Sequence, residues 1–184
     1  MNTPTETLRD EHVLILRALD LLETAAARVE RGLAIPEGWW AGVIAWLRGF
    51  ADRNHHAKEE RALFPAMARA GVPAEAGGPI AVMQEEHGQG RALLQVVADG
   101  EARPRVVAAR RYIELLRNHI EKENEVLFPL ADDVLDRAAQ DALGREFAAV
   151  TAEMGRHASL EHAAAALQAL VTELAGSPDA AGTR

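Results

Sequence analysis

The chain has 184 residues, a formal net charge of −8 and no cysteine. Its length suits one domain with an appendage, and the lack of cysteine excludes disulfides, cysteine-ligated iron–sulfur clusters and thiolate zinc sites. There is no basic block, so nucleic acid is not expected as a partner, because phosphate binding needs a positive surface. With no apolar run of membrane-spanning length and no signal-peptide core, we expect a cytoplasmic protein without a membrane partner.

Good helix formers are abundant and β-branched runs are scarce, so the sequence indicates helices separated by Gly and Pro. The first helix should begin with Thr3 as N-cap, Pro4 at the first helical position and Glu6 completing a capping box. It should end near Gly32. The further helices are expected over Glu37–Ala70, Pro79–Asp99, Pro104–Ala131 and Leu135–Leu174. Pro65 and Pro129 each remove a backbone hydrogen bond, so each should kink or close the helix that contains it.

Four helices with short connections typically pack antiparallel in an up-down-up-down bundle. The predicted fold class is therefore all-α: a four-helix bundle over residues 1–132 with an additional C-terminal fifth helix over residues 133–175. Residues 176–184 are expected to form a flexible tail.

One motif occurs twice. "NHHAKEERALFP" runs from Asn54 to Pro65, and "NHIEKENEVLFP" runs from Asn118 to Pro129. Aligned on "LFP", His55 matches His119 and Glu59 matches Glu123. The His-x-x-x-Glu spacing places both side chains of a pair on one helix face, roughly 6 Å apart along the axis.

The histidines are also spaced so that they meet at one height of such a bundle. Residues on adjacent antiparallel helices face each other when they are equally far from the turn that joins them. The midpoint of His12 and His55 falls in the turn after Gly32, that of His55 and His87 at Gly71, and that of His87 and His119 beside the break before Pro104. Four helices should therefore each contribute one histidine to a single layer, beside the two motif glutamates.

Six polar side chains inside an apolar bundle cost several kcal/mol unless they are paired, and a metal centre resolves that cost. The set is too large for one four-coordinate structural zinc, and magnesium and calcium prefer oxygen ligands. Two metals, each held by two imidazoles with both carboxylates bridging, fit the count. Imidazole with carboxylate suits iron, with manganese or zinc as alternatives. The candidate metal ligands are His12, His55, Glu59, His87, His119 and Glu123.

At these residues the chain resembles the hemerythrin-like, or HHE cation-binding, family over about residues 8–131. The motifs that carry the resemblance are "DEH" at Asp10–His12, "HHAKEERALFP", "EEH" at Glu85–His87 and "HIEKENEVLFP". The resemblance implies a four-helix bundle that holds two iron ions in an oxo- or hydroxo-bridged non-haem centre. It also implies that the four histidines are terminal ligands and that the two glutamates bridge the irons.

Two features depart from well-known members of that family. Oxygen-carrying hemerythrins have a fifth histidine in a His-x-x-x-His pair on the third helix, whereas the positions four residues either side of His87 are Met83 and Arg91. Iron–sulfur-repair members usually carry a cysteine-containing N-terminal domain. We therefore expect a stand-alone member with a nearly symmetric two-plus-two histidine site, in which each metal keeps an open position for a small ligand such as O2, NO or peroxide.

Other polar residues near the motifs are weaker candidates. His56 points about 100° away from His55 around an α-helix, so a role in the site is the less favoured interpretation. Glu11, Glu60 and Glu86 are interpreted as solvated groups or as partners that orient a ligand histidine.

The expected fifth helix contains "HASLE" at His157–Glu161, which repeats the His-x-x-x-Glu spacing. With His162 it could reach over the centre, although incidental surface histidines are the favoured interpretation. Tyr112, seven residues before His119, is expected either in the core or along an access path.

The leading functional hypothesis is a di-iron protein that binds or senses O2 or NO, or that handles iron. The alternative is an enzyme that consumes peroxide, O2 or NO at the same centre, since ligand activation at a metal needs little beyond positioning and a dry cavity. The sequence does not separate binding from turnover. A remote alternative is a metal-free helical interaction module. The sequence gives no indication of the oligomeric state.

Overall fold

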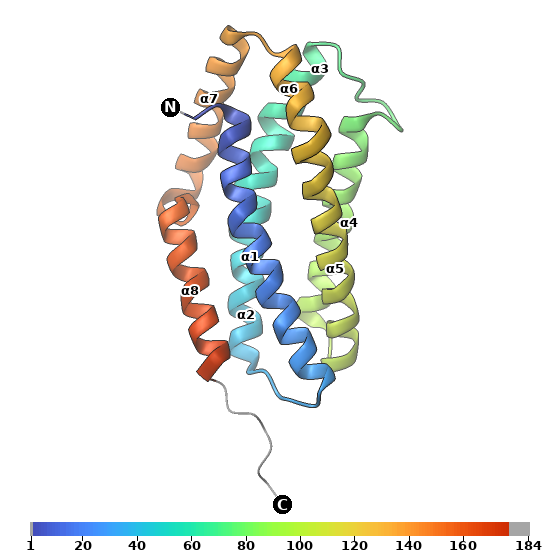
Figure 1. Ribbon diagram of the computed structural model, residues 1–184, viewed down its shortest axis with the longest axis vertical. Helices are drawn as coiled ribbons and strands as arrows, with labels where there is room; N and C mark the ends of the chain where they lie inside the picture. The colour runs from blue at the N-terminus through green and yellow to red at the C-terminus, as the bar shows by residue number, and fades with distance from the viewer. Residues whose placement is uncertain (1, 177–184) are drawn as a thin grey trace, which may run out of the picture.

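The computed structural model describes residues 2–176, apart from the side chains of residues 156 and 157, and the described part is helical with no strand. Figure 1 shows four long helical rods side by side with two further helices along one side of the bundle. The first rod is α1 (Pro4–Glu30) and the third is α4 (Pro79–Asp99). The predicted all-α bundle with a C-terminal helical addition is confirmed.

The start of α1 follows the predicted capping box. The Thr3 side chain accepts from the Glu6 backbone N–H at 3.2 Å, and a Glu6 carboxylate oxygen accepts from the Thr3 N–H at 2.7 Å. These bonds satisfy two helix-end N–H groups that have no partner within the helix. The chain reverses at Gly32 (φ 81°) and at Gly71 (φ 97°), where a side chain would be strained.

The second and fourth rods change their winding at the motif residues. The second rod comprises α2 (Glu37–Trp46), the π-helical η1 (Leu47–His56) and η2 (Glu59–Leu63), and α3 (Phe64–Arg69). The fourth comprises α5 (Ala102–Lys122), the π-helical η3 (Glu123–Leu127) and α6 (Phe128–Val134). A π turn lies directly before Pro65 and Pro129, where the ring crowds the preceding turn and an N–H is missing. At each proline the helix is therefore locally wider, and a short α-helix, α3 or α6, ends the rod.

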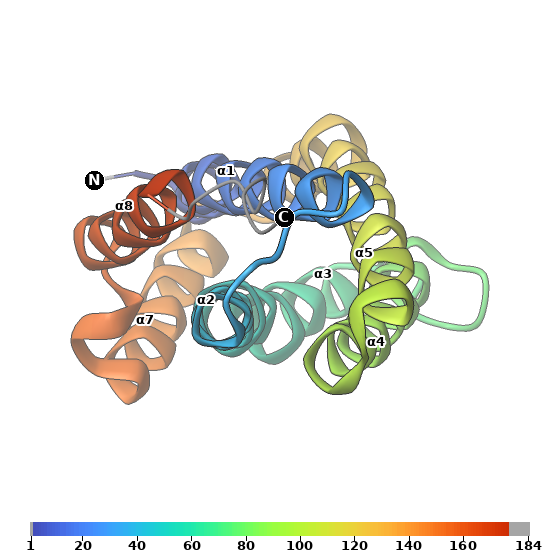
Figure 2. The same cartoon turned by 90° about the horizontal axis from the view of Figure 1, so that it is seen from below.

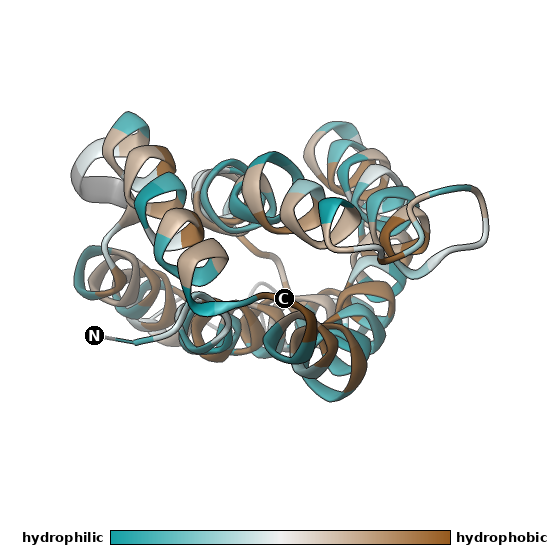
Figure 3. Ribbon diagram, turned by 90° about the horizontal axis from the view of Figure 1, so that it is seen from above, coloured by the Kyte–Doolittle hydropathy of each residue, from teal (hydrophilic) through white to brown (hydrophobic). Residues whose placement is uncertain are grey.

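Two apolar clusters fill the bundle. One cluster includes Leu19, Trp39, Leu47 and Leu116, and the other includes Leu8 and the two motif phenylalanines. Along α1, His12 lies between Leu8 of one cluster and Ile15 of the other. A polar layer therefore separates two dry cores. From above, each helix carries hydrophobic and hydrophilic stretches on different sides, as expected for amphipathic helices around a core (Figure 3).

The C-terminal addition differs from the single helix expected over Leu135–Leu174. It consists of α7 (Arg137–Met154), the 3-10 turn η4 (Gly155–Ala158) and α8 (Leu160–Gly176). Gly155 adopts a φ of 63°, which breaks the helix at a residue that tolerates this conformation. Figures 1 and 2 show both helices on the side of the first and second rods, away from α4 and α5: α8 packs on α1 and α2, and α7 packs on α1, η1 and η2. The expected flexible tail lies outside the described residues, except that Gly176 ends α8.

Two indole groups attach α8 to α2. Trp39 donates from Nε1 to the Leu170 carbonyl and Trp46 to the Ala163 carbonyl, each at 2.9 Å. The paired residues run in opposite directions along the chain, so α2 and α8 pack antiparallel. Between residues 2 and 176, none of the helices is both long and apolar enough to cross a membrane.

Candidate metal centre

Six buried side chains from four rods meet in the polar layer. They come from α1, η1, η2, α4, α5 and η3, and each is at most 1% exposed. The ring centroids of His12 and His55 are 4.6 Å apart, and those of His87 and His119 are 4.7 Å apart. We call the first pair the first half-site and the second pair the second half-site. The structure thus brings together all six candidate ligands: His12, His55, Glu59, His87, His119 and Glu123.

Each carboxylate faces one histidine of each half-site. One oxygen of Glu59 and one of Glu123 point toward the first half-site, and their other oxygens point toward the second. The Nε2-to-oxygen distances are 3.6 Å for His55 to Glu59 Oε1, 3.4 Å for His87 to Glu59 Oε2, 3.2 Å for His12 to Glu123 Oε2, and 3.1 Å for His119 to Glu123 Oε1. This is the arrangement needed for two carboxylates that bridge two metal ions.

The other nitrogen of each histidine is held by an acceptor. The Nδ1 distances are 2.9 Å for His12 to Asn124 Oδ1, 3.0 Å for His55 to Glu11 Oε2, 2.8 Å for His87 to Glu60 Oε1, and 2.8 Å for His119 to Glu86 Oε2. An Nδ1–H that donates outward leaves the Nε2 lone pair directed inward. Such outer partners orient metal-ligating histidines and raise their basicity.

Several inward-facing atoms have no hydrogen-bond partner. They are all four carboxylate oxygens of Glu59 and Glu123, together with Nε2 of His12. In the second half-site the two Nε2 atoms lie 3.0 Å apart, which suits two adjacent imidazole ligands because such metal–nitrogen bonds are about 2.1 Å long. Buried polar atoms without partners are costly, and a cation would satisfy all of them at once. The donor set therefore fits metal ions.

The protonation of the metal-free centre is uneven. Burial, then repulsion from Glu123, raises the pKa of Glu59 well above its usual range. Burial also opposes ionisation of Glu123, but His119 and His12 outweigh it and lower the Glu123 pKa well below its usual range. For His119, burial opposes protonation, yet Glu123 and Glu86 raise its pKa to about 9. For His55, burial and the nearby His12 lower the pKa to about 4. The metal-free site therefore favours a protonated imidazole at His119 and opposes the ionisation of Glu59.

The phenylalanine of each "LFP" covers a histidine of another rod. Phe64 stacks on His87 with ring centroids 5.8 Å apart, and Phe128 stacks on His12 at 5.4 Å. Each ring shields one side of an imidazole from water. The repeated "LFP" therefore contributes both the proline at the end of the π turn and an apolar cover for the layer.

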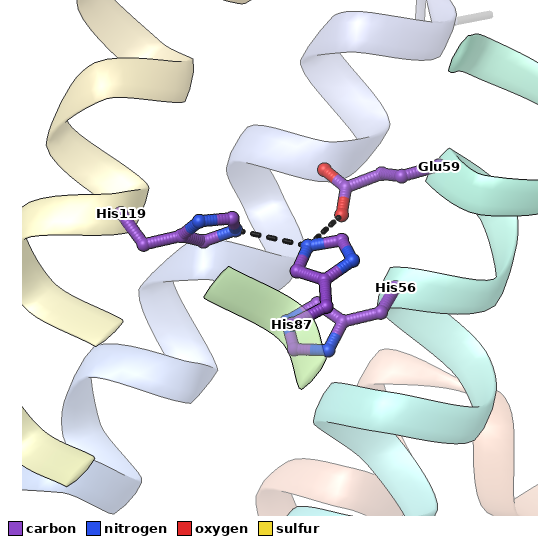
Figure 4. A group of neighbouring side chains, drawn as sticks. All are labelled: His56, Glu59, His87 and His119. Atoms are coloured by element: carbon purple, nitrogen blue, oxygen red, sulfur yellow. Dashed lines mark hydrogen bonds and ion pairs between the residues drawn. The ribbon is translucent and has the colours of Figure 1, made fainter. Parts of the chain in front are cut away.

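Sequence reasoning set His56 largely aside, but the structure buries it beside the second half-site. Two groups of four residues have ligand atoms within 4.8 Å of one another: His12, His55, Glu59 and Glu123; and His56, Glu59, His87 and His119 (Figure 4). The expectation of outward direction assumed an α-helix, whereas η1 is π-helical at this point.

Asn124 was not considered as a partner from the sequence. The aligned motifs could have indicated this role, because Asn124 follows Glu123 as Glu60 follows Glu59. The three glutamates considered as partners, Glu11, Glu60 and Glu86, each accept a hydrogen bond from a candidate ligand histidine.

The C-terminal histidines do not complete the centre as far as the structure describes them. His162 is exposed on α8, and neither group of candidate ligands includes it. The side chain of His157 lies outside the described residues. Tyr112 is buried and lines a groove between α2 and α4 that also reaches His56.

Comparison with known proteins identifies relatives of the chain. The chain is 33% identical over 141 residues to the iron-sulfur cluster repair protein YtfE of Cronobacter sakazakii, covering 66% of this chain and 63% of that protein. It is 32% identical over 139 residues to the protein of the same name from Musicola paradisiaca, covering 68% and 61%, and 37% identical over 120 residues to that of Escherichia coli, covering 58% and 54%. The match thus spans less than two thirds of these relatives.

No solved structure matches the chain significantly. The Hemerythrin HHE cation binding domain family matches residues 3–131, the segment that contains all six candidate ligands and the partners of their Nδ1 atoms. The chain belongs to the hemerythrin HHE cation-binding domain family.

Proposed function

We propose that the chain binds two iron ions in the polar layer and uses them to bind or sense small diatomic ligands such as O2 or NO, or to handle iron. In this proposal the first half-site holds one ion, the second holds the other, and Glu59 and Glu123 bridge them. The observation that carries it is the set of four buried carboxylate oxygens without partners, each facing an imidazole Nε2.

The choice of iron follows from the donor chemistry. Imidazole with carboxylate suits iron, and manganese or zinc are the competitors. When bound, iron supplies redox chemistry and coordination positions for small ligands. The protein contributes orientation through the Nδ1 partners and exclusion of water through Phe64 and Phe128. The names of the relatives, which refer to iron–sulfur cluster repair, support handling of iron as one form of this function.

Metal analysis of protein purified from iron-replete cells tests the proposal. We expect about two irons per chain and the near-ultraviolet absorption of a bridged pair. The variant His55→Ala/His119→Ala removes one imidazole from each half-site and should lose most of the iron, whereas His162→Ala, which changes an exposed histidine on α8, should keep it. Wild-type protein with no more iron than the double variant would overturn the proposal and favour a metal-free helical module.

A second candidate, turnover of peroxide, O2 or NO, is favoured by the groove of about 640 Å³ that reaches His56 from the surface between α2 and α4. Such a groove gives small molecules a route to the layer. Repeated consumption of peroxide or NO by the reduced protein, over many cycles per chain, would identify an enzyme. A single stoichiometric reaction would identify a binding protein or sensor.

A further inference from the structure

The two motif copies differ at a buried position beside the centre. His56 in the first copy aligns with Ile120 in the second, and both side chains are buried, at 4% and 3% exposure. Ile120 belongs to an apolar cluster, so packing alone is satisfied at this place by a hydrocarbon. A buried imidazole is the more costly choice unless its nitrogens find partners.

His56 lies against the second half-site. Its ring stacks on His87 with centroids 3.9 Å apart and planes at 16°, and its centroid is 5.8 Å from that of His119. One of its ring nitrogens lies within 4.8 Å of the ligand atoms of Glu59, His87 and His119 (Figure 4). The π winding of η1 makes this possible, because a wider turn reduces the angle between successive residues and lets both His55 and His56 face inward.

A ring nitrogen of His56 lacks a hydrogen-bond partner, which makes His56 a candidate metal ligand. Its Nδ1 is buried and makes no hydrogen bond, and the nearest carboxylate oxygen, Asp52 Oδ1, is 3.5 Å away.

We propose that His56 is a third imidazole ligand of the metal ion in the second half-site, which makes the centre unequal, with three histidines at one position and two at the other. This inference rests on the proposed function. The second rod then supplies a fifth histidine, whereas the third rod has Met83 and Arg91 four residues either side of His87.

The two metal positions also differ in their distance from the groove between α2 and α4. The groove between α2 and α4 is lined by His56, Tyr112 and Arg91. Arg91 donates to Asp52 at 2.7 Å and to Glu60 at 2.6 Å, and Glu60 accepts from His87. A small ligand that enters by this groove meets the His56 side first, so the three-histidine position is the one closer to the entrance.

The test uses the full chain loaded with iron, and the variants His56→Ala and His56→Gln. Ile120→Val is the matched control, because it trims the equivalent position in the other motif copy. Wild-type protein should give two distinct iron environments in its Mössbauer spectrum. Both His56 variants should bring the two environments closer together and weaken iron binding at least about tenfold, while Ile120→Val should resemble wild type.

Unfolding of the metal-free variants separates loss of a ligand from loss of fold. The His56 variants should fold without metal, with stability near that of wild type, because they remove a buried polar ring. If both variants bind iron as tightly as wild type and give the same spectrum, the inference is wrong while the proposed function stands. If wild type itself binds no more iron than His55→Ala/His119→Ala, the proposed function fails and the inference fails with it.

Discussion

The first half of the bundle comprises the first and second rods, and the second half comprises the third and fourth rods. Each half orients histidines of both halves through hydrogen bonds to Nδ1. In the first half, Glu11 on α1 accepts from His55, and in the second half, Glu86 on α4 accepts from His119. The residue after Glu59 and the residue after Glu123 each reach into the other half, Glu60 to His87 and Asn124 to His12. Each half therefore orients one histidine of its own and one of its partner's, so neither half-site is formed by one half alone.

The halves differ where the surroundings differ. Lys58 and Glu11 are both 2% exposed, whereas the side chain of Lys122, the equivalent partner of Glu86, is 42% exposed. α7 and α8 cover the outer side of the first half, whereas the groove lies between α2 of the first half and α4 of the second, and His56 lies beside the second half-site. Two copies of one motif thus lie in different surroundings, because the chain outside the motif is not repeated.

The largest expected effect comes from the residues shared by both half-sites. Glu59→Gln or Glu123→Gln should reduce bound iron from about two to fewer than one per chain, because each carboxylate faces both half-sites. The stabilisation that iron gives to wild type, a rise in Tm of roughly 5 to 15 °C, should be lost. Metal analysis and thermal unfolding measure both quantities. Glu121→Gln, on an exposed position of α5, is the control, and either variant retaining two irons would contradict the bridging arrangement.

The ion pairs Lys58–Glu11 and Lys122–Glu86 should contribute very differently to the free energy of unfolding. Glu11→Gln leaves the Lys58 ammonium buried without its partner, which costs roughly 3 to 5 kcal/mol. Glu86→Gln should cost less, because Lys122 remains partly solvated and the glutamine amide oxygen can still accept from His119. Denaturant unfolding of the metal-free protein measures both. Adding Lys58→Met to Glu11→Gln should recover most of the loss, and equal costs for the two single variants would show that burial does not distinguish the halves.

The equivalent histidines of the two motifs should titrate far apart in the metal-free protein. His119 should lose its proton at about pH 9 and His55 should gain one only at about pH 4. Because the His119 pKa is raised, its contribution to stability is complete below the unfolded value of 6.5 and is lost as the pH rises to about 9. For His55 the lowered pKa removes stability as the pH falls from 6.5 to about 4.

Ring-proton NMR measures both histidine titrations, and calorimetry in buffers of different ionisation enthalpy measures the protons released by metal. Metal uptake at neutral pH should release the His119 proton, since a ligand nitrogen must be unprotonated. Metal affinity should therefore increase from neutral pH to about pH 9. Similar titration of the two histidines, or uptake without proton release, would contradict the unequal charge of the halves.

The smallest effect concerns the cover on the first half. Trp46→Phe removes the indole donor to the Ala163 carbonyl and should lower the free energy of unfolding by about 1 kcal/mol. The position that aligns with Trp46 in the second half is Arg110, whose ion pairs with Glu23 and Glu30 lie at the surface. Arg110→Ala should cost less than 1 kcal/mol, and less still in high salt. A loss of unfolding free energy for Trp46→Phe that changes with salt concentration would contradict the assignment to an uncharged hydrogen bond.

Much of the fold was predictable from local chemistry. The capping box at Thr3 and the helix over Pro79–Asp99 occur as expected, because caps, prolines and glycines act within a few residues of their own positions. The single fifth helix was not correct, since Gly155 lies in a run of otherwise good helix formers and only its observed φ reveals the break. The predicted domain limits remain predictions.

The sequence by itself determined which residues could meet in the layer. The doubled His-x-x-x-Glu and the equal distances from the turns depend only on helix rise and connection length. Tertiary structure alone decided that the second rod is π-helical over Leu47–His56, that His56 therefore turns inward, and that Asn124 reaches His12 across the bundle. These features depend on contacts between segments far apart in the chain, and such contacts change the angle of a side chain without leaving a periodic signal in the sequence.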